Sequence, residues 1–451
     1  MKVKTYPDMK DSGVPWIGEI PECWETIRLK FLLEGGLRNG LFKKKDQFGR
    51  GTKLVNVSDL YSGDFYINDD TLERVETTPK EVEMFGVHGG DLFFVRSSLK
   101  LEGIAIAACA KESEETRVFE CHLVGGRPHK NRVNSRFVTY YLHSRTIRDR
   151  LISLAQTTTM TTISQDKIGG LPVLVPKLEE QHAIASYLDR KTAAIDSIIE
   201  KKQRLLTLLE EKRAALINHA VTKGLNPDVP MKDSGVPWIG EIPEHWRVMK
   251  LGYLGQLQNG LNIGGDSFGS GDPFISYGDV YNNAILPSNP VGLVRSSVND
   301  QMKYSLRVGD VLFTRTSETI DDIGIASTCL QEISKVTFAG FLIRFRPLPG
   351  NLAPSFSSFL FRNQNIQGYF ARNVNLVTRA SLSQDILKTL PICLPPLNEQ
   401  IQIAAHLSKM ALAFEQLDRF LVRQVELLKE RRQALITAAV TGKIDVRGEE
   451  A

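Results

Sequence analysis

The sequence predicts an α+β protein in which two globular domains are joined by two long helices, packed as an antiparallel coiled coil, with an internal pseudo-two-fold repeat. Residues 9–24 and 231–246 are identical except that His245 replaces Cys23, and together they hold all four tryptophans. We call them the first and second tryptophan segments. Each is followed by a stretch of mixed composition and then by a long segment without proline or glycine. This order, written twice, indicates two copies of one structural unit.

The repeat continues through the globular stretches, where the two copies have diverged. Asn-Gly-Leu at 39–41 returns at 259–261, Arg96 and Ser98 return as Arg315 and Ser317, and Ser-Gln-Asp at 164–166 returns at 383–385. We therefore expect a first globular domain at 1–176 and a first long helix region at 177–230. A second globular domain at 231–395 and a second long helix region with a C-terminal tail at 396–451 should follow.

The proline- and glycine-free segments, residues 179–222 and 398–441, carry apolar residues at alternating spacings of four and three. This spacing is typical of a coiled-coil seam. Three lysines interrupt the first seam, so Ala194, Ile199 and Leu206 beside it should share the buried stripe. Because each copy supplies one helix of matched length, we expect the two helices to pack on each other within the chain. An intermolecular coiled coil is the alternative.

The globular stretches combine short β-branched or aromatic runs with helical patterns, which predicts α+β domains. In the first copy we expect strands at 53–57, 92–95, 104–108 and 171–175, and a helix at 136–148. In the second we expect strands at 311–314, 323–327 and 341–345, and a helix at 355–367. These patterns do not specify the order of the strands.

Composition excludes several classes of protein. Of 451 residues, 42% are hydrophobic and 24% charged, as in ordinary globular proteins. With 56 Lys plus Arg against 52 Asp plus Glu, the net charge of +4 excludes a histone-like polycation but not a local basic face.

The five cysteines are scattered and form no CxxC pair, which favours a reducing compartment over a disulfide or zinc framework. The first residues lack the apolar core of a signal peptide. The longest apolar run, 104–110, is far shorter than the roughly 18 residues of a membrane span. We therefore expect a soluble, cytoplasmic protein with no membrane partner.

Motifs for catalysis are missing from the sequence. It contains no GxxxxGK[ST] or GxGxxG phosphate loop, no HExxH, and no Asn-Pro-Pro-aromatic sequence of an amino-methyltransferase. The histidines are dispersed, and no Cys, Asp or Glu cluster completes a metal site around His122 and His129. We expect no catalytic residue, no metal and no cofactor on this chain, which leaves binding as its chemistry.

Basic and amide side chains in loops of both copies are the candidates for contacts with DNA. Arg and Lys neutralise phosphates, Arg also reads guanine, and Asn or Gln reads adenine. The candidates are Arg38, Asn39, Lys43, Lys44, Lys45, Arg50, Arg96, Ser98, Thr158 and Thr159 in the first copy, and Asn259, Asn262, Arg315, Ser317, Arg379 and Ser381 in the second. For any one of them, a solvated loop is an equally good interpretation.

The repeated SGVPWIGEIPxxW sequence, the LPxxxPxLxEQ sequence before each long helix (171–181 and 390–400), and the Ala-Leu-Ile and Ala-Val-Thr sequences near the helix ends carry a family resemblance. Over essentially the whole chain, the sequence resembles the specificity subunit of type I restriction–modification systems.

The resemblance implies that each globular part is a target recognition domain that reads one half of a bipartite, asymmetric site in double-stranded DNA. It implies that the helix pair sets the spacing and docks two modification subunits, which methylate adenine with S-adenosylmethionine. Restriction subunits, which use ATP and Mg²⁺, complete the endonuclease, and this chain itself is non-catalytic. Because the two globular parts have diverged, two different half-sites are expected.

Two other functions are weighed against this one. The first is a non-catalytic coiled-coil scaffold that does not bind DNA. It predicts weak DNA affinity that does not change with salt, whereas phosphate contacts make DNA binding fall steeply with salt. The second is an enzyme acting on DNA by itself, which the missing motifs disfavour.

Overall fold

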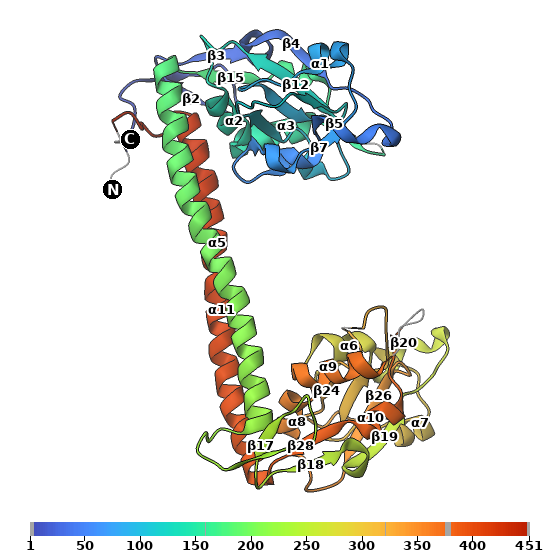
Figure 1. Ribbon diagram of the computed structural model, residues 1–451. Coiled ribbons are helices and arrows are strands. Elements are labelled where there is room, and N and C mark those ends of the chain that lie inside the picture. The colour runs from blue at the N-terminus through green and yellow to red at the C-terminus, as the bar shows by residue number, and fades with distance from the viewer. Residues whose placement is uncertain (1–3, 158, 321, 375–379, 449–451) are drawn as a thin grey trace. The chain divides into compact units, whose positions relative to one another are not determined.

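A computed structural model describes residues 4–157, 159–320, 322–374 and 380–448 (Figure 1). Thr158 and Arg379, two of the candidate DNA contacts, lie outside these residues. The chain divides into two compact units, Met1–Gln203 with Val422–Ala451, and Arg204–Leu421. In the described part of the chain, no helix is both long and apolar enough to cross a membrane.

Two long helices, α5 (Leu178–Lys223) and α11 (Leu397–Val440), pack together as the sequence predicted (Figure 1). In the first unit, Ile195 and Ile199 of α5 pack against Val425 of α11. Of the three neighbours expected to share the buried stripe, Ile199 is buried and Leu206 half-buried, but Ala194 is exposed. The seam residue Ile198 is 43% exposed. Asp196 of α5 pairs with Arg432 of α11, and Lys202, further along α5, pairs with Gln424, which comes earlier in α11, so the pair is antiparallel.

A buried glutamine ties the start of each long helix to its globular domain. Gln181 accepts a hydrogen bond from the backbone N–H of Asn134 (2.8 Å) and donates to the carbonyls of Arg132 and Pro176 (3.0 and 2.9 Å). Gln400 accepts from the N–H of Ala353 (2.8 Å) and donates to Asn351 and Pro395 (both 3.0 Å). The final Gln of LPxxxPxLxEQ is therefore a structural residue.

The glutamate before this glutamine, Glu180 in the first unit, binds the tryptophan segment through a hydrogen bond. In the first unit, strands β1 (Met9–Asp11) and β2 (Glu19–Pro21) form a hairpin, and the indole N–H of buried Trp24 donates to Glu180 at 3.2 Å. Gly442, just after α11, lies against Pro21 and Trp24 with φ of +68°. A side chain at this position would collide with Pro21, so only glycine fits.

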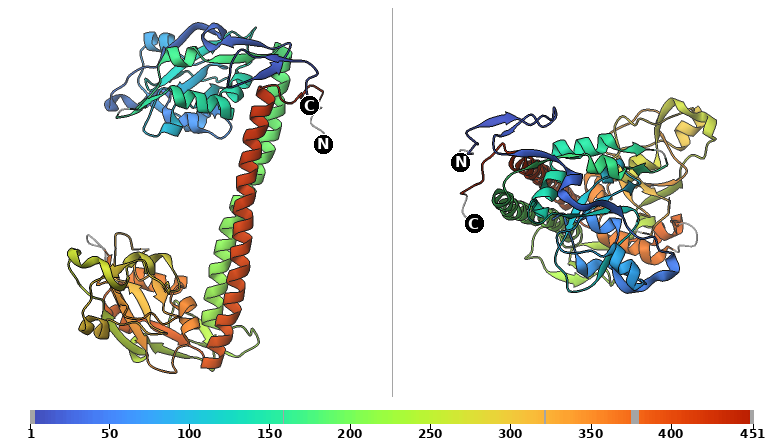
Figure 2. Two further views of the ribbon diagram at one scale, coloured as in Figure 1. Left: turned by 180° about the vertical axis from the view of Figure 1, so that it is seen from behind. Right: turned by 90° about the horizontal axis from the view of Figure 1, so that it is seen from above.

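The second unit repeats this contact between tryptophan segment, helix start and helix end, which we call the joint. Strands β16 (Met231–Asp233) and β17 (Glu241–Pro243) form the hairpin, Trp246 donates to Glu399 at 3.0 Å, and Gly224 packs on the indole with φ of +77°. Each tryptophan thus lies where one long helix begins and the other ends. In the first unit the segment after α11 lies beside the first residues of the chain (Figure 2). There the Asp445 N–H donates to the Lys4 carbonyl at 2.8 Å.

The first globular domain is built on a five-stranded sheet. Its strands, in spatial order, are β4 (Leu33–Asn39), β12 (Leu123–Pro128), β8 (Leu92–Val95), β10 (Ala107–Ala110) and β6 (Tyr66–Ile67). Smaller sheets are β11 (Arg117–Phe119), β5 (Phe48–Val55) and β7 (Glu73–Val75); β13 (Gln156–Thr157), β14 (Thr161–Thr162) and β9 (Ser97–Ser98); and β15 (Pro172–Val175) with β3 (Glu25–Arg28). The helices are α1 (Pro79–Phe85), α2 (Ser135–His143), α3 (Arg145–Leu154) and α4 (Gln165–Gly169).

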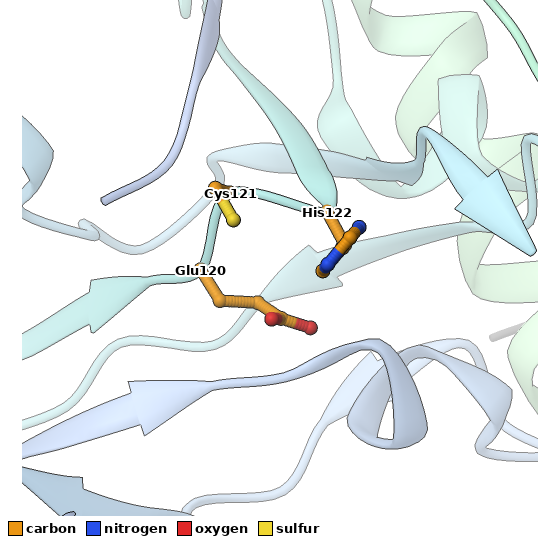
Figure 3. A group of neighbouring side chains, drawn as sticks. All are labelled: Glu120, Cys121 and His122. Carbon is orange, nitrogen blue, oxygen red and sulfur yellow. The ribbon is translucent and has the colours of Figure 1, made fainter. Parts of the chain in front are cut away.

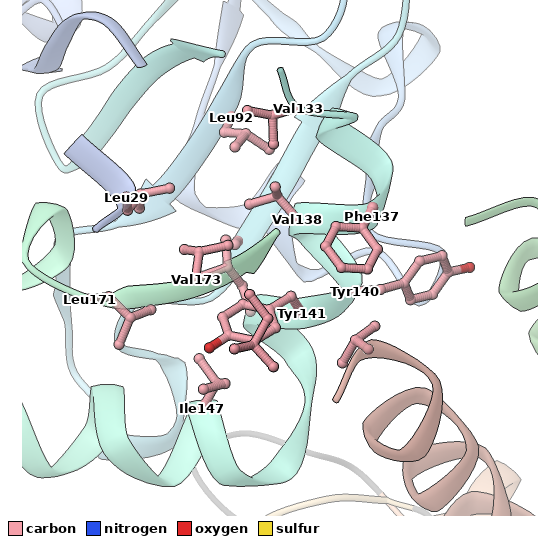
Figure 4. Close-up of a cluster of buried hydrophobic side chains, with 14 of the residues drawn as sticks. Leu29, Leu92, Val133, Phe137, Val138, Tyr140, Tyr141, Ile147, Leu171 and Val173 are labelled. Carbon is pink, nitrogen blue, oxygen red and sulfur yellow. The ribbon is translucent and has the colours of Figure 1, made fainter. Parts of the chain in front are cut away.

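Helix α2 supplies the centre of this domain's core. Phe137, Val138 and Tyr141 are fully buried and pack with Leu92 of the sheet and Val173 of β15 (Figure 4). The same cluster includes Ile184 and Leu188 of α5 and Ile436 of α11, so in the first unit the domain and the helix ends share one core.

The second globular domain follows the same plan. A four-stranded sheet has the order β19 (Gly255–Asn259), β26 (Leu342–Pro347), β22 (Val311–Thr314) and β24 (Ala326–Thr328). Smaller sheets are β21 (Leu293–Val294), β20 (Phe268–Ile275) and β25 (Thr337–Phe338); β23 (Thr316–Ser317) with β27 (Ala380–Ser381); and β18 (Arg247–Lys250) with β28 (Pro391–Leu394). The helices are α6 (Tyr277–Asn282), α7 (Val298–Lys303), α8 (Pro354–Leu360), α9 (Gln364–Asn373) and α10 (Gln384–Thr389).

The structure corrects the prediction of one helix at 136–148 and one at 355–367, because each is two helices. Ser144, between α2 and α3, has extended backbone (φ −63°, ψ 144°) and donates its hydroxyl to the Tyr141 carbonyl at 2.6 Å. Asn363, before α9, caps that helix by accepting from the Ile366 N–H at 3.1 Å. At this place in each copy a side chain donates to a carbonyl in the last turn of the first helix, Ser144 to Tyr141 and Asn363 to Leu360. Only Asn363 also caps the next helix.

Candidate nucleic-acid interface

Arg96 and Arg315 follow the central strands β8 and β22 and have the same backbone partners in both domains. The Arg96 N–H donates to the His122 carbonyl (2.9 Å), and its carbonyl accepts from Ile163 (3.0 Å). The Arg315 N–H donates to Phe341, and its carbonyl accepts from Leu382, both at 2.8 Å. Within the described residues, neither guanidinium has a hydrogen bond or ion pair. Each domain therefore presents an uncommitted cation from a fixed backbone.

Polar candidate segments pair with the short strands that follow these arginines. Strand β9, which contains Ser98, pairs with β14, and Thr159 is exposed in the turn before β14. Strand β23, which contains Ser317, pairs with β27, which contains Ser381. Ser98 and Ser317 each accept a hydrogen bond from a backbone N–H two residues ahead, both at 3.2 Å. Both serine hydroxyls thus shape the turn that follows the arginine.

Arg38, another candidate, is already used inside the first domain. Its guanidinium donates to the carbonyls of Met84 (2.9 Å) and Gly86 (3.1 Å) and lies 5.8 Å from the centre of the Phe119 ring. Burial lowers the pKa of its guanidinium. These contacts give Arg38 a structural role, and a contact with DNA stays a prediction.

The basic run that follows is partly neutralised. Lys43 forms an ion pair with Glu81 at 2.8 Å, its side chain is only 7% exposed, and its hydrogen bond is the main reason why the pKa of Glu81 falls to about 2. Arg50 is paired with Glu76 but remains highly exposed. Lys44 and Lys45 are exposed. Of this run, which the sequence predicted to be free as a whole, Lys44 and Lys45 are the cations without an ion pair among the described residues.

An amide pair recurs in both domains. The Asn39 and Gln165 amides lie 2.7 Å apart, and the Asn259 and Gln384 amides 2.9 Å apart. Each pair joins the end of an edge strand to the first residue of α4 or α10 at the surface. An amide has more donors and acceptors than one such bond uses. Asn262 is exposed and packs over Gly340.

A cleft adjoins the arginine strand of each domain, and sequence reasoning missed both. The lining of the first is Val57, Tyr61, Ser97, Ser98, Leu99, Lys100, Glu102, Gly103, Ile106, Glu120, His122 and Met160. That of the second is Tyr277, Tyr281, Thr316, Ser317, Glu318 and Asp322. The tyrosines come from the helical turns after β5 and β20, which are far from the arginines in sequence, so no local pattern pointed to them.

Two residues of the first cleft, Glu120 and His122, form with Cys121 a group of three metal-binding residue types, a cluster that the sequence did not predict around His122. The carboxylate of Glu120, the thiol of Cys121 and the imidazole of His122 lie within 4.8 Å of one another (Figure 3). Glu120 already accepts from the Val57 N–H at 2.9 Å, and His122 Nδ1 lies 2.5 Å from the Ser97 hydroxyl. Burial raises the pKa of the Cys121 thiol, which opposes the thiolate that a metal needs. We assign no metal to these residues.

Comparison with known families decides what kind of protein carries these paired features. Residues 21–207 and 243–419 match the family described as the type I restriction modification DNA specificity domain. The chain belongs to this family. It is a DNA specificity subunit of a type I restriction–modification system, with two target recognition domains and no catalytic role of its own.

Relatives match the specificity subunit over nearly its whole length. The EcoKI specificity subunit of Escherichia coli K12 is 22% identical, with 95% of this chain and 90% of the relative covered. The EcoBI subunit of Escherichia coli is also 22% identical, over 98% and 90% of the two chains.

Two solved structures share the fold. A chain from a structure describing complex assembly and conformational transition of a type I restriction–modification system aligns with a TM-score of 0.67 at 16% identity, covering 93% of this chain and 98% of that one. The HsdS subunit of Thermoanaerobacter tengcongensis aligns with a TM-score of 0.55 at 16% identity, covering 94% and 98%.

Proposed function

We propose that the two target recognition domains, residues 1–176 and 231–395, each read one half of a bipartite, asymmetric site in double-stranded DNA. The observation that carries this proposal is the pair Arg96 and Arg315. Each arginine follows the central strand of its domain, and its guanidinium has no partner among the described residues. The two residues after each arginine line a cleft, and the two clefts differ in chemistry. The arginine that both domains share suits a contact common to both half-sites, such as a phosphate. The different residues that line the two clefts suit different bases.

The remaining candidates divide by chemistry. Lys44, Lys45 and Arg50 are exposed cations suited to phosphates, which position a protein on DNA without reading sequence. Asn39 and Asn259 present amides suited to adenine. Lys43, Ser98, Thr158, Thr159, Asn262, Ser317, Arg379 and Ser381 complete the proposed contact set, and Arg38 belongs to it through its exposed position on β4.

The long helix regions, 177–230 and 396–451, set the separation of the two half-sites and dock two modification subunits. Apolar side chains standing exposed on α5 and α11 support the docking role. In the second unit Leu412 is 62% and Phe420 57% exposed, and in the first unit Leu427 is 46% exposed. Outward-facing apolar residues on a coiled coil that already has a buried seam suit further helices from a partner.

The chemistry of the complex then belongs to its other subunits. The modification subunits bind S-adenosylmethionine and methylate adenine, and restriction subunits use ATP and Mg²⁺, so this chain needs no cofactor of its own. The complex works in the cytoplasm, where its DNA substrate lies, and involves no membrane.

Methylation mapping tests the proposal. The chain is co-expressed with the modification subunit encoded beside it in a host that lacks adenine methylation, and modified adenines are located by long-read sequencing. The expected result is one bipartite motif with two different halves and a methylated adenine in each. If the complex forms and binds its cofactor but leaves the DNA unmethylated, the proposal is wrong and the scaffold function gains support.

A further inference from the structure

The clefts beside Arg96 and Arg315 occupy the same place in the two domains. Each lies between the strand that follows the arginine and the helical turn that follows β5 or β20. That turn begins with the same capping box, Asn56 with Asp59 in the first domain and Ser276 with Asp279 in the second. Two residues after Asp59 and Asp279, the turn carries Tyr61 and Tyr281, each of which lines its cleft.

The second cleft is held in shape by a carboxylate. The Tyr281 hydroxyl donates to Asp322 Oδ1 at 2.9 Å, and the Thr319 hydroxyl donates to Asp322 Oδ2 at 2.6 Å. A carboxylate can accept about four hydrogen bonds. Asp322 therefore keeps lone pairs on both oxygens, and the Tyr281 hydroxyl, whose proton is committed to Asp322, faces any further partner as an acceptor.

The two tyrosines of this cleft are held by contacts within the domain. The rings of Tyr277 and Tyr281 stack with centroids 6.0 Å apart and planes 20° apart. The end of α6 is fixed from beneath by Arg362, which donates to the carbonyls of Val280 (2.9 Å), Tyr281 (3.1 Å) and Asn283 (2.9 Å). The acceptor groups of the cleft are thus positioned before any ligand arrives.

The charge of this cleft selects what it can bind. Glu318 and Asp322 both line it, so it repels a phosphate group. Its surface of carboxylate and hydroxyl acceptors complements a neutral hydrogen-bond donor. In the major groove, the donors on base edges are the exocyclic amino groups of cytosine (N4) and adenine (N6), and acidic side chains accept from cytosine N4.

We propose that the cleft lined by Asp322, Glu318 and Tyr281 reads an exocyclic amino group, on cytosine or adenine, in the second half-site. This inference rests on the proposed function and adds to it the chemical group that one domain recognises. Arg315 immediately precedes the lining residues Thr316 and Ser317 and supplies a cation that lets this acidic part of the domain approach DNA.

The first cleft differs in these residues and provides the matched control. Leu99 stands where the second domain has Glu318, and it is 85% exposed. Lys100 and the His122–Ser97 pair add donors, and Glu120 already accepts from Val57. Glu102 also lines this cleft, so Glu102→Gln removes one negative charge, as Asp322→Asn does, but beside the other half-site.

The test measures binding by the complex with its modification subunit. After the wild-type motif has been mapped, each adenine of the second half-site is replaced in turn by purine, and each cytosine by 2-pyrimidinone, so that only an amino group is lost. At one position the loss should weaken wild-type binding about tenfold. Asp322→Asn and Glu318→Gln should reduce or abolish that discrimination, whereas Glu102→Gln should leave it unchanged.

The first half-site serves as an internal control for folding, because a correctly folded variant still discriminates there. The inference is overturned if no amino deletion in the second half-site matters. It is equally overturned if both acidic variants keep the full discrimination, or if they weaken binding to every sequence alike. A wild-type complex that prefers no sequence would instead overturn the proposed function itself.

Discussion

Arg38 and Arg344 hold the same place in their two domains although they lie on different strands. Arg38 on β4 faces Gly125 of β12, and Arg344 on β26 faces Gln258 of β19. Their guanidinium carbons lie 5.8 Å from the Phe119 ring and 5.6 Å from the Phe338 ring. Arg38 donates to the carbonyl of Gly86, and Arg344 donates to that of Ser305, each in the loop before its central strand. The copies have thus kept one interaction while moving the arginine across a strand pair.

This relationship predicts that Arg38 contributes to stability more than to DNA recognition. Arg38→Ala should lower the free energy of unfolding of the first domain by about 1–3 kcal/mol, because two charged hydrogen bonds to backbone carbonyls are lost. Denaturant unfolding followed by tryptophan fluorescence measures this. Arg50→Ala, which removes a highly exposed cation, should change stability by less than about 1 kcal/mol. Equal effects of the two substitutions would contradict the structural role.

Arg96 and Arg315 should act on separate half-sites. Arg96→Ala should weaken binding to the first half-site by about 1–3 kcal/mol and leave the base preferences of the second intact, and Arg315→Ala should do the reverse. Binding to duplexes with one randomised half-site gives both readouts. Lysine at either position distinguishes a phosphate contact, which it preserves, from bidentate reading of guanine, which it does not. A loss spread over both half-sites from either substitution would point to a general structural effect.

His143 should make the first domain sensitive to acid. The ring is buried, stacks on Phe65 at 3.6 Å, and its Nε2 lies 2.6 Å from the Ala107 carbonyl. Burial lowers the pKa of His143 to about 3. An unfolded histidine titrates near 6.5, so below that pH the unfolded state takes up a proton that the folded state refuses.

The stability that a neutral His143 provides is therefore present above pH 6.5 and is lost as the pH falls toward 3. At pH 5 the loss should be about 2 kcal/mol. Denaturant unfolding between pH 8 and pH 4 measures it. His143→Gln should flatten this part of the profile even if the variant is less stable at pH 8. An unchanged slope in the variant would assign the acid sensitivity to other groups.

Exposed apolar residues on the long helices should be needed for docking the modification subunits. Phe420→Asp or Leu412→Asp should weaken assembly at least tenfold, because a charge would be buried against an apolar partner surface. Analytical size exclusion with the modification subunit measures assembly. Val291, which is 95% exposed in the second domain, gives the control Val291→Asp. If both helix variants assemble normally, the partner binds elsewhere.

The helix pair should act as a ruler. Deleting seven residues in register from both α5 and α11 shortens each helix by about 10.5 Å. This should reduce the unread spacer of the DNA site by about three base pairs, at 3.4 Å per pair. Methylation mapping of the shortened protein gives the new spacer directly. A deletion confined to one helix would place the seam out of register and is expected to destabilise the pair.

The architecture could be predicted from the sequence because its signals are local and strong. The absence of proline and glycine, together with the four-and-three spacing, predicted helices at 179–222 and 398–441, which are observed as α5 and α11. The repeated tryptophan segments predicted two copies of one unit. The break at Ser144 was missed because the apolar pattern continues through it, and only its extended backbone interrupts the helix.

The DNA-contact residues were harder to predict because a side chain's freedom depends on remote partners. Lys43 looked like part of an open basic run, but Glu81 on α1 neutralises it. Arg38 looked similar to Arg96, but carbonyls at 84 and 86 hold its guanidinium. Asp322 and Tyr281 share a cleft although they lie 41 positions apart in the chain.

The sequence by itself determined the repeat, the two long helices and the family, because these depend on patterns that recur within a few residues. Only the tertiary structure decided which cations are free and which groups line the two clefts. Those properties arise where segments distant in the chain meet. Hydrogen bonds, ion pairs and burial there determine which charged side chains remain available to a ligand.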